Sequence, residues 1–197
     1  MKKNFNYFYC LLMVVLFSSC GIQSIPMQKN QTEADLSKIV NEYKRRADLI
    51  PNLVAVVKGY ASHEQETLTA VTEARAKATQ LTVDASSLTP EKMQEFRQIQ
   101  GDLSMALGKL MSISERYPDL KADVQFRDLQ SQLESTENQI ANARNRYIES
   151  VKVFNNLVSV PPTSWTNSLF YNLSKMTQWT LEESEAKAVE KAPEVKF

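Results

Sequence analysis

The chain has 197 residues, with 23 basic and 23 acidic side chains and a formal net charge of zero. This length suits one domain, or at most two, with a sizeable apolar core. Because a nucleic-acid-binding protein needs a clustered basic face, the balanced charge argues against nucleic acid as a partner. The whole chain holds only 4 glycines, and its abundant Ala, Leu, Gln, Glu and Lys predict an all-α fold.

The first 19 residues have the pattern of an export signal. Two lysines near the start precede an apolar run at residues 8–17, which is shorter than the roughly 20 residues of a transmembrane helix. Small residues directly before Cys20 are typical of a bacterial lipobox, although Phe17 stands where leucine is usual. We predict a signal peptide at residues 1–19 and membrane attachment through lipid on Cys20. An ordinary secretory signal and an uncleaved anchor remain alternatives.

A flexible tether and then a long helix are predicted next. Residues 20–31 are polar and lack clear periodicity. Between residues 32 and 58, apolar or small side chains recur at alternating steps of four and three, which draws one stripe down a helix. The stripe consists of Leu36, Val40, Tyr43, Ala47, Ile50, Val54 and Val57. It passes through Pro51 without changing phase, so we predict one helix kinked at Pro51 and ended by Gly59.

The second and third helices are predicted from their starting signals. Ser62 and Gln65 fit a capping box, and Thr89 followed by a proline is typical of a helix start. The predicted inward residues of the third helix are Met93, Phe96, Ile99, Leu103, Ala106, Leu110 and Ile113. Gly101 and Gly108 share one face of this helix, which suggests close approach of a neighbouring helix, with chance as the alternative.

The fourth predicted helix, residues 120–158, is the longest. Its inward set is Phe126, Leu129, Leu133, Ile140, Tyr147, Val151, Phe154 and Val158. Short connections favour antiparallel neighbours, so we predict an antiparallel four-helix bundle with long helices over residues 32–160, with a seam resembling coiled-coil packing. Residues 161–197 form an aromatic and charged tail, and Trp and Tyr there are residue types favoured at a bilayer interface.

A cluster of charged residues lies beside the predicted core. Arg46 flanks the apolar stripe of the first helix, whereas Glu137 and Arg144 lie near the core face of the fourth, where that stripe is interrupted. We hypothesise that Arg46 pairs with Glu137 across the bundle and helps to set the register of the two helices. The alternative is that these long side chains extend to water.

The sequence offers little for catalysis or metal binding. His63 is the single histidine, and a polar residue near a helix start needs no catalytic explanation. One histidine cannot supply the paired Glu-x-x-His motifs of a di-iron bundle or the two histidines of a zinc-protease helix. Glu134 and Glu137 would suit calcium, but solvated acids on a helix are far commoner. We predict no enzymatic activity, no cofactor and no metal.

Several long stretches together resemble the LemA family. They are residues 43–54, 57–61, 63–64, 74–75, 115–122, 126–130, 133–140, 143–144 and 193–197. The resemblance implies an antiparallel helical bundle held at the bacterial membrane by its N-terminus and facing away from the cytoplasm, and it brings no catalytic residues. The chain departs from the family at the lipobox, where many relatives have a transmembrane anchor. It also departs at Leu36, often a tryptophan, and at Val160, where relatives tend to have Phe before proline. Residues 165–179 match poorly.

Together these features predict a non-enzymatic lipoprotein of the bacterial cell envelope that works as an interaction or scaffold module. Its expected partners are the membrane, through lipid on Cys20, and an unknown envelope protein. In a cell with two membranes it would be periplasmic. Two alternatives stay open: a subunit of an envelope enzyme that uses His63, and a secreted or transmembrane-anchored structural spacer.

Overall fold

The computed structural model describes residues 22–81, 83 and 88–179, and all regular secondary structure in that part of the chain is helical. The prediction of an all-α fold is confirmed. The elements in chain order are α2 (Ser24–Tyr60), α3 (Gln65–Gln80), α4 (Pro90–Ile113), α5 (Pro118–Ala122), α6 (Val124–Ser159), α7 (Thr163–Thr166) and the π-helix η2 (Asn167–Tyr171). Among the described residues, none of these helices is both long and apolar enough to cross a membrane.

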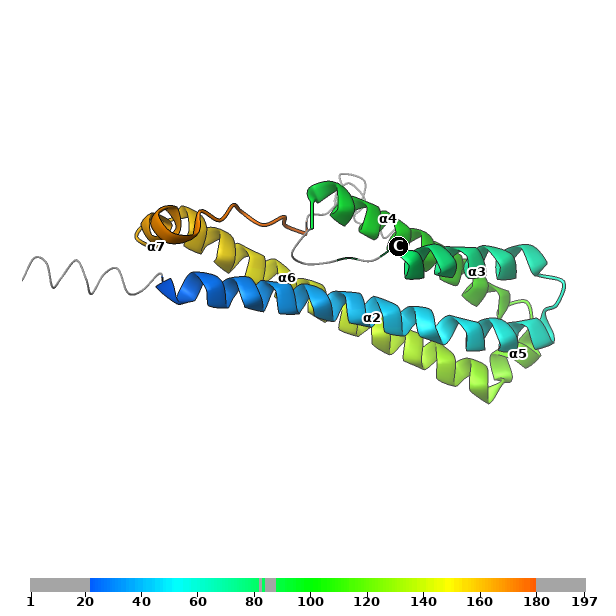
Figure 1. Cartoon of the computed structure of the whole chain (residues 1–197). Helices are drawn as coiled ribbons and strands as arrows, with labels where there is room; N and C mark the ends of the chain where they lie inside the picture. The colour runs from blue at the N-terminus through cyan, green and yellow to red at the C-terminus, as the bar shows by residue number, and fades with distance from the viewer. Residues whose placement is uncertain (1–21, 82, 84–87, 180–197) are drawn as a thin grey trace, which may run out of the picture.

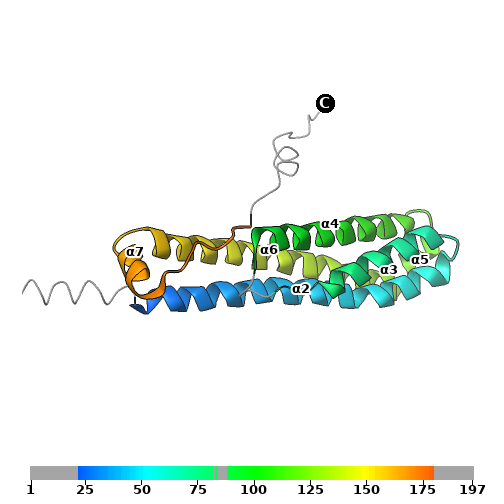
Figure 2. The same cartoon turned by 45° about the horizontal axis from the view of Figure 1, so that its top comes forward.

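The two longest helices, α2 and α6, lie side by side and run in opposite directions (Figure 1). α3 and α4 pack along the half of this pair that lies toward the end of α2, where α5 also lies (Figures 1 and 2). We call this half the broad end. At the other extremity, which we call the narrow end, α2 begins, α6 ends, and α7 and η2 lie across them (Figure 2).

Helix α2 begins earlier than the sequence predicted. The predicted tether is helical from Ser24 onward, and α2 runs without interruption through Pro51 to Tyr60, so Gly59 lies inside the helix. The reason is contact with α6 rather than an apolar stripe. Ile25 is fully buried in a small apolar cluster, and the Gln28 side-chain amide donates to a backbone carbonyl of α6 at 2.9 Å. The kink at Pro51 stays a prediction.

The predicted capping box at Ser62 is wrong. α3 begins at Gln65 with Glu64 as its N-cap residue, and neither a Ser62 nor a Glu64 side chain caps it. The Glu64 carboxylate instead accepts a hydrogen bond from the Tyr117 hydroxyl at 3.3 Å and pairs with Arg116 at 3.1 Å. This acid therefore joins the turn before α3 to the turn after α4. The other predicted cap is present, since Thr89 Oγ1 accepts from a first-turn backbone amide of α4.

The predicted fourth helix is divided into α5 and α6 at Asp123. Asp123 has an extended backbone with ψ of 131°, and its carboxylate accepts from the Phe126 amide at 2.8 Å. The Tyr60 hydroxyl donates to the same carboxylate at 2.9 Å. The Phe126 amide first, and then Tyr60, hold the pKa of Asp123 below its ordinary value. This cap starts α6 and also attaches it to the end of α2.

The predicted inward face of α6 is correct throughout, because every member of that set is buried. Thr136 and Ala143 fill the two positions where its apolar stripe is interrupted. On α4 the buried face instead includes Gln100 and Leu107. The predicted close approach at Gly101 and Gly108 is wrong: a Cβ atom added at either would meet nothing within 4 Å.

Candidate functional site

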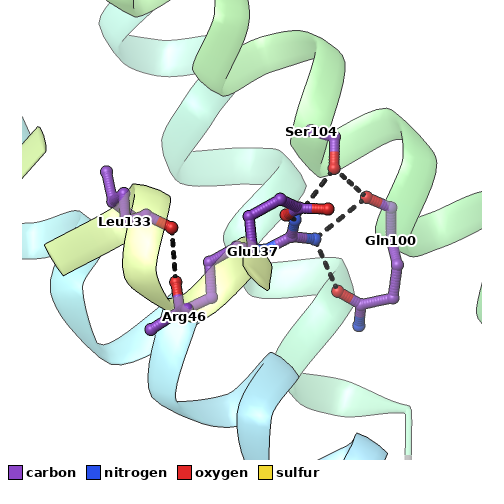
Figure 3. A network of polar contacts seen from close by, with 6 residues as sticks. Arg46, Gln100, Ser104, Leu133 and Glu137 are labelled. Carbon is purple, nitrogen blue, oxygen red and sulfur yellow. Dashed lines mark hydrogen bonds and ion pairs between the residues drawn. The ribbon is translucent and has the colours of Figure 1, made fainter. Parts of the chain in front are cut away.

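Arg46 of α2 is a buried charged residue, 3% exposed, that makes polar contacts to two other helices. Its Nη1 lies 2.7 Å from Glu137 Oε2 on α6 and donates to Ser104 Oγ on α4 at 3.0 Å. Its Nη2 donates to both the backbone and the side-chain oxygens of Gln100, each at 3.3 Å. One guanidinium thus ties α2 to α4 and α6 (Figure 3). We call these four residues the Arg46 network.

The residues around the guanidinium explain how the fold accommodates it. The Tyr43 ring, one turn earlier on α2, lies 5.0 Å from the Arg46 guanidinium carbon, a cation–π distance. On α6 the buried Thr136 donates its hydroxyl to the Leu133 carbonyl at 2.8 Å, so its own polar group is satisfied within the helix. The buried Arg46 Nε, by contrast, has no hydrogen-bond partner among the described residues.

The pair hypothesised from the sequence is present, but its two members have different environments. The Arg46 side chain is 4% exposed and that of Glu137 is 53% exposed. Arg46 therefore loses more hydration free energy on folding than Glu137 does, and its hydrogen bonds to α4 and α6 offset that loss. The alternative that these side chains extend to water applies only to the Glu137 carboxylate.

Arg144, the third member of the predicted cluster, lies outside the Arg46 network. Its guanidinium lies 6.0 Å from the centre of the Trp179 ring, and that of Arg97 on α4 lies 5.8 Å from the same ring. The Trp179 ring also meets Phe96 edge-to-face at 6.4 Å. Arg144 is therefore paired with an aromatic side chain of the C-terminal region, which the sequence placed in an exposed tail.

A surface groove of about 660 Å³ lies over the Arg46 network and extends to Trp179. We call it the α4–α6 groove. It is lined by Tyr43, Gln94, Arg97, Gln98, Gln100, Gly101, Asp102, Ser104, Met105, Glu137, Arg144 and Trp179. Two basic and two acidic side chains face it, together with one tryptophan ring and one exposed methionine. This arrangement suits a polypeptide of mixed charge that also offers an apolar side chain.

Trp179 reaches the groove because residues 172–179, which we call the strap, are fastened to α6. The Asn155 side chain accepts from the Met176 amide at 2.8 Å and donates to the Met176 carbonyl at 3.1 Å. The Tyr147 hydroxyl donates to the Thr177 carbonyl at 3.1 Å, and burial raises the pKa of Tyr147 to about 12. The sequence analysis missed the strap. Its one signal was an asparagine at the core face of α6.

The other residues considered for chemistry are dispersed. His63 is exposed in the turn between α2 and α3. Glu134 accepts a hydrogen bond from the Gln130 side chain at 3.1 Å, while Glu137 forms the ion pair with Arg46. Within the described ranges, no three His, Cys, Asp or Glu residues lie close enough together to hold a metal ion. Cys20, the predicted lipid attachment site, lies outside the described residues.

Comparison with known proteins agrees with the family resemblance. The sequence model of the LemA family matches residues 35–197. The chain belongs to the LemA family. It is also similar to Protein LemA of Metamycoplasma hominis, with 28% identity over 171 residues, in a match that covers 83% of this chain and 73% of that protein.

The LemA match extends beyond the stretches identified from the sequence. It includes residues 161–197, of which only the last few had been recognised as LemA-like, so the strap and Trp179 belong to the family region. The Arg46 network and every residue that lines the α4–α6 groove also lie within the match. The first turns of α2, before residue 35, lie outside it even though they pack on α6.

Proposed function

We propose that this LemA-family protein is a non-enzymatic interaction module of the bacterial envelope, attached to the membrane through lipid on Cys20 and facing away from the cytoplasm. Its four long helices, α2, α3, α4 and α6, would act as an antiparallel four-helix bundle that presents the α4–α6 groove to a partner protein. The family supports this assignment at the level of a LemA-type protein. The groove is our candidate for the partner site.

The observation that carries the proposal is the Arg46 network beneath the groove. A guanidinium that bonds to residues of α4 and α6 at once holds the two walls of the groove at a fixed separation. A preformed surface loses less conformational entropy when it binds, which favours binding. The mixed charges of the groove would select a partner by electrostatic complementarity, and the Trp179 ring offers an aromatic anchor of the kind that dominates interface energies.

Site-specific photocrosslinking in cells tests the partner site. A photoreactive amino acid replaces Met105, which is exposed and lines the groove, in the full-length protein. The matched control replaces Glu73, an exposed residue of α3 that lies outside the groove. We expect a discrete protein adduct from position 105 and none from position 73, and we expect the adduct to diminish when Cys20→Ala removes the anchor. Equal adducts at both positions, or none at position 105, would contradict the proposal.

Charge reversal separates a binding module from a structural spacer. Arg97 lines the groove, whereas Arg146 is exposed on α6 outside it. We expect Arg97→Glu to abolish the adduct from position 105 while Arg146→Glu leaves it intact. A spacer would tolerate both reversals equally, and loss of the adduct with Arg146→Glu alone would place the partner on another face.

A further inference from the structure

The narrow end exposes a compact set of large apolar side chains. Trp165 on α7 is 69% exposed, and Leu169 and Phe170 on η2 are 76% and 60% exposed. We call these three residues the end patch. Large apolar surfaces that stay exposed on a folded domain commonly mark a site of contact with another molecule or a membrane.

The exposure results from an inverted orientation of the short helices. Thr166 and Asn167, which are polar, are buried, while the apolar residues on either side of them face outward. The Asn167 side chain accepts from the Leu173 amide and donates to the Leu173 carbonyl, each at 3.0 Å. An ordinary surface helix places its polar side outward. Here the bonds of a buried asparagine hold the opposite side toward solvent.

The two chain segments that form the end patch and its immediate support contain no charged residue. In a chain in which 23% of residues are charged, residues 153–174 contain no Asp, Glu, Lys or Arg, and neither do residues 22–28. The two segments meet at the narrow end, where the Tyr171 hydroxyl donates to the Ile22 carbonyl. Met27 near the start of α2 is also exposed. A surface that combines aromatic and aliphatic groups with uncharged polar groups can enter a bilayer interface without desolvating an ion.

The position of the predicted lipid attachment site indicates that the end patch contacts a lipid bilayer. Cys20 precedes Ile22 by two residues, so an extended chain can separate them by only ~7 Å. Either lipid on Cys20 or an uncleaved apolar leader would bring the membrane to the narrow end, next to the end patch. We infer that Trp165, Leu169 and Phe170 insert into the interface of that same lipid bilayer, as a second attachment beside the N-terminus. This inference depends on the membrane attachment in the proposed function.

Tryptophan fluorescence tests the insertion, because the chain contains only 2 tryptophans. In the full-length protein, Trp179→Phe leaves Trp165 as the sole emitter, and the matched variant Trp165→Phe leaves Trp179, which packs on Phe96 outside the end patch. Both proteins are reconstituted into phosphatidylglycerol–phosphatidylethanolamine vesicles with bromine at a shallow acyl position. We expect bromine to roughly halve the emission of Trp165, as for an interfacial tryptophan, and to leave that of Trp179 unchanged.

Flotation of the same samples separates this inference from the proposed function. Protein that floats with the vesicles while Trp165 stays unquenched would overturn the second attachment and leave the anchor intact. Protein that fails to float would overturn membrane attachment itself. If Trp165 is unquenched and the double variant Leu169→Gln, Phe170→Gln lowers the oligomeric state in sedimentation, the patch is an interface between copies and the bilayer assignment is wrong.

Discussion

The broad and narrow ends of the molecule each bury a phenylalanine of α6 at 1% exposure, but in very different surroundings. Phe126 belongs to an apolar cluster that draws side chains from α2, α3, α4, α5 and α6. Within the part of the chain that the structure describes, Phe154 shares a cluster with two other buried residues, Ile25 and Val158. The same residue type at the same exposure thus contributes to a large core at one end and a small one at the other.

The difference shows two ways of holding a long helix pair together. At the broad end, burial of apolar surface from several helices supplies the stability. At the narrow end, side-chain amides of Asn155 and Asn167 bind backbone groups of the strap, and large apolar groups remain exposed. We therefore expect the broad end to unfold as one cooperative unit and the narrow end to open more easily. This difference agrees with the separate roles proposed for the groove and the end patch.

The two phenylalanines provide the strongest test of this contrast. We expect Phe126→Ala to lower the free energy of unfolding by about 4 kcal/mol, because the surrounding helices cannot close the cavity. Phe154→Ala should cost roughly 2 kcal/mol less, since its smaller cluster can collapse around the vacancy. Urea unfolding followed by circular dichroism measures both. Equal losses would show that the two ends contribute equally to stability.

The Arg46 network gives the next largest effect. We expect Arg46→Ala to cost about 3 kcal/mol, because it removes contacts to two helices and leaves polar groups buried without partners. Glu137→Gln should cost only about 1 kcal/mol, because Glu137 is half exposed and Arg46 keeps its bonds to Gln100 and Ser104. Thermal unfolding of both variants measures the order. An unchanged melting temperature for Glu137→Gln would mean that the ion pair contributes nothing.

Removing the fastening of the strap should affect only the narrow end and the wall of the groove. We expect Asn155→Ala to cost about 2 kcal/mol, to accelerate amide exchange across residues 173–179, and to shift the emission of Trp179 toward that of an exposed ring. Asn156→Ala is the matched control, since that neighbour is exposed. Faster exchange in α3 or α4 as well would show that the two ends open as one unit.

Alkaline pH should weaken the same fastening through Tyr147. Burial favours the neutral phenol and raises its pKa from 10.0 to about 12. Its contribution to stability is therefore complete below pH 10 and is lost as the pH rises toward 12, at about 1 kcal/mol per pH unit within that window. We expect Tyr147→Phe to make the urea midpoint less sensitive to pH between 9 and 11. An unaltered pH profile would contradict a buried, neutral Tyr147.

The smallest expected effect is a gain in stability at the broad end. Gly108 lies in α4, is exposed, and has space for a methyl group. Gly108→Ala should stabilise the protein by about 0.5–1 kcal/mol through helix propensity alone. Differential scanning calorimetry measures the shift. A loss of stability would instead indicate that a neighbouring helix approaches Gly108 closely, as the glycine spacing first suggested.

How much of this molecule its sequence predicts depends on the kind of interaction involved. Helical periodicity located the buried face of α6 and placed Arg46 and Glu137 on facing sides of two helices, because side-chain direction follows residue spacing. The sequence did not predict the start of α2 because residues 24–31 have too few apolar positions to form a stripe. Ile25 is buried there only because it packs against residues of α6 that are distant in sequence. The predicted capping box at Ser62 is absent because α3 begins later, at Gln65, and Glu64 before it bonds to Tyr117 and Arg116 in the turn after α4.

The strap shows the limit most clearly. Asn155 holds it through the backbone of Met176, and a backbone acceptor leaves no pattern in the sequence. Because the strap was not predicted, Trp179 was assigned to an exposed tail and the groove that it helps to line was not foreseen. Likewise, the outward orientation of Trp165 depends on bonds made by the buried Asn167, which periodicity does not reveal.

The most direct test of the two-ended account is photocrosslinking from both ends in the same cells. A photoreactive amino acid placed at Phe170 samples the end patch, and one placed at Met105 samples the α4–α6 groove, with each adduct identified by mass spectrometry. The account predicts lipid adducts from position 170 and a protein adduct from position 105. A protein adduct from position 170 together with lipid adducts from position 105 would contradict it.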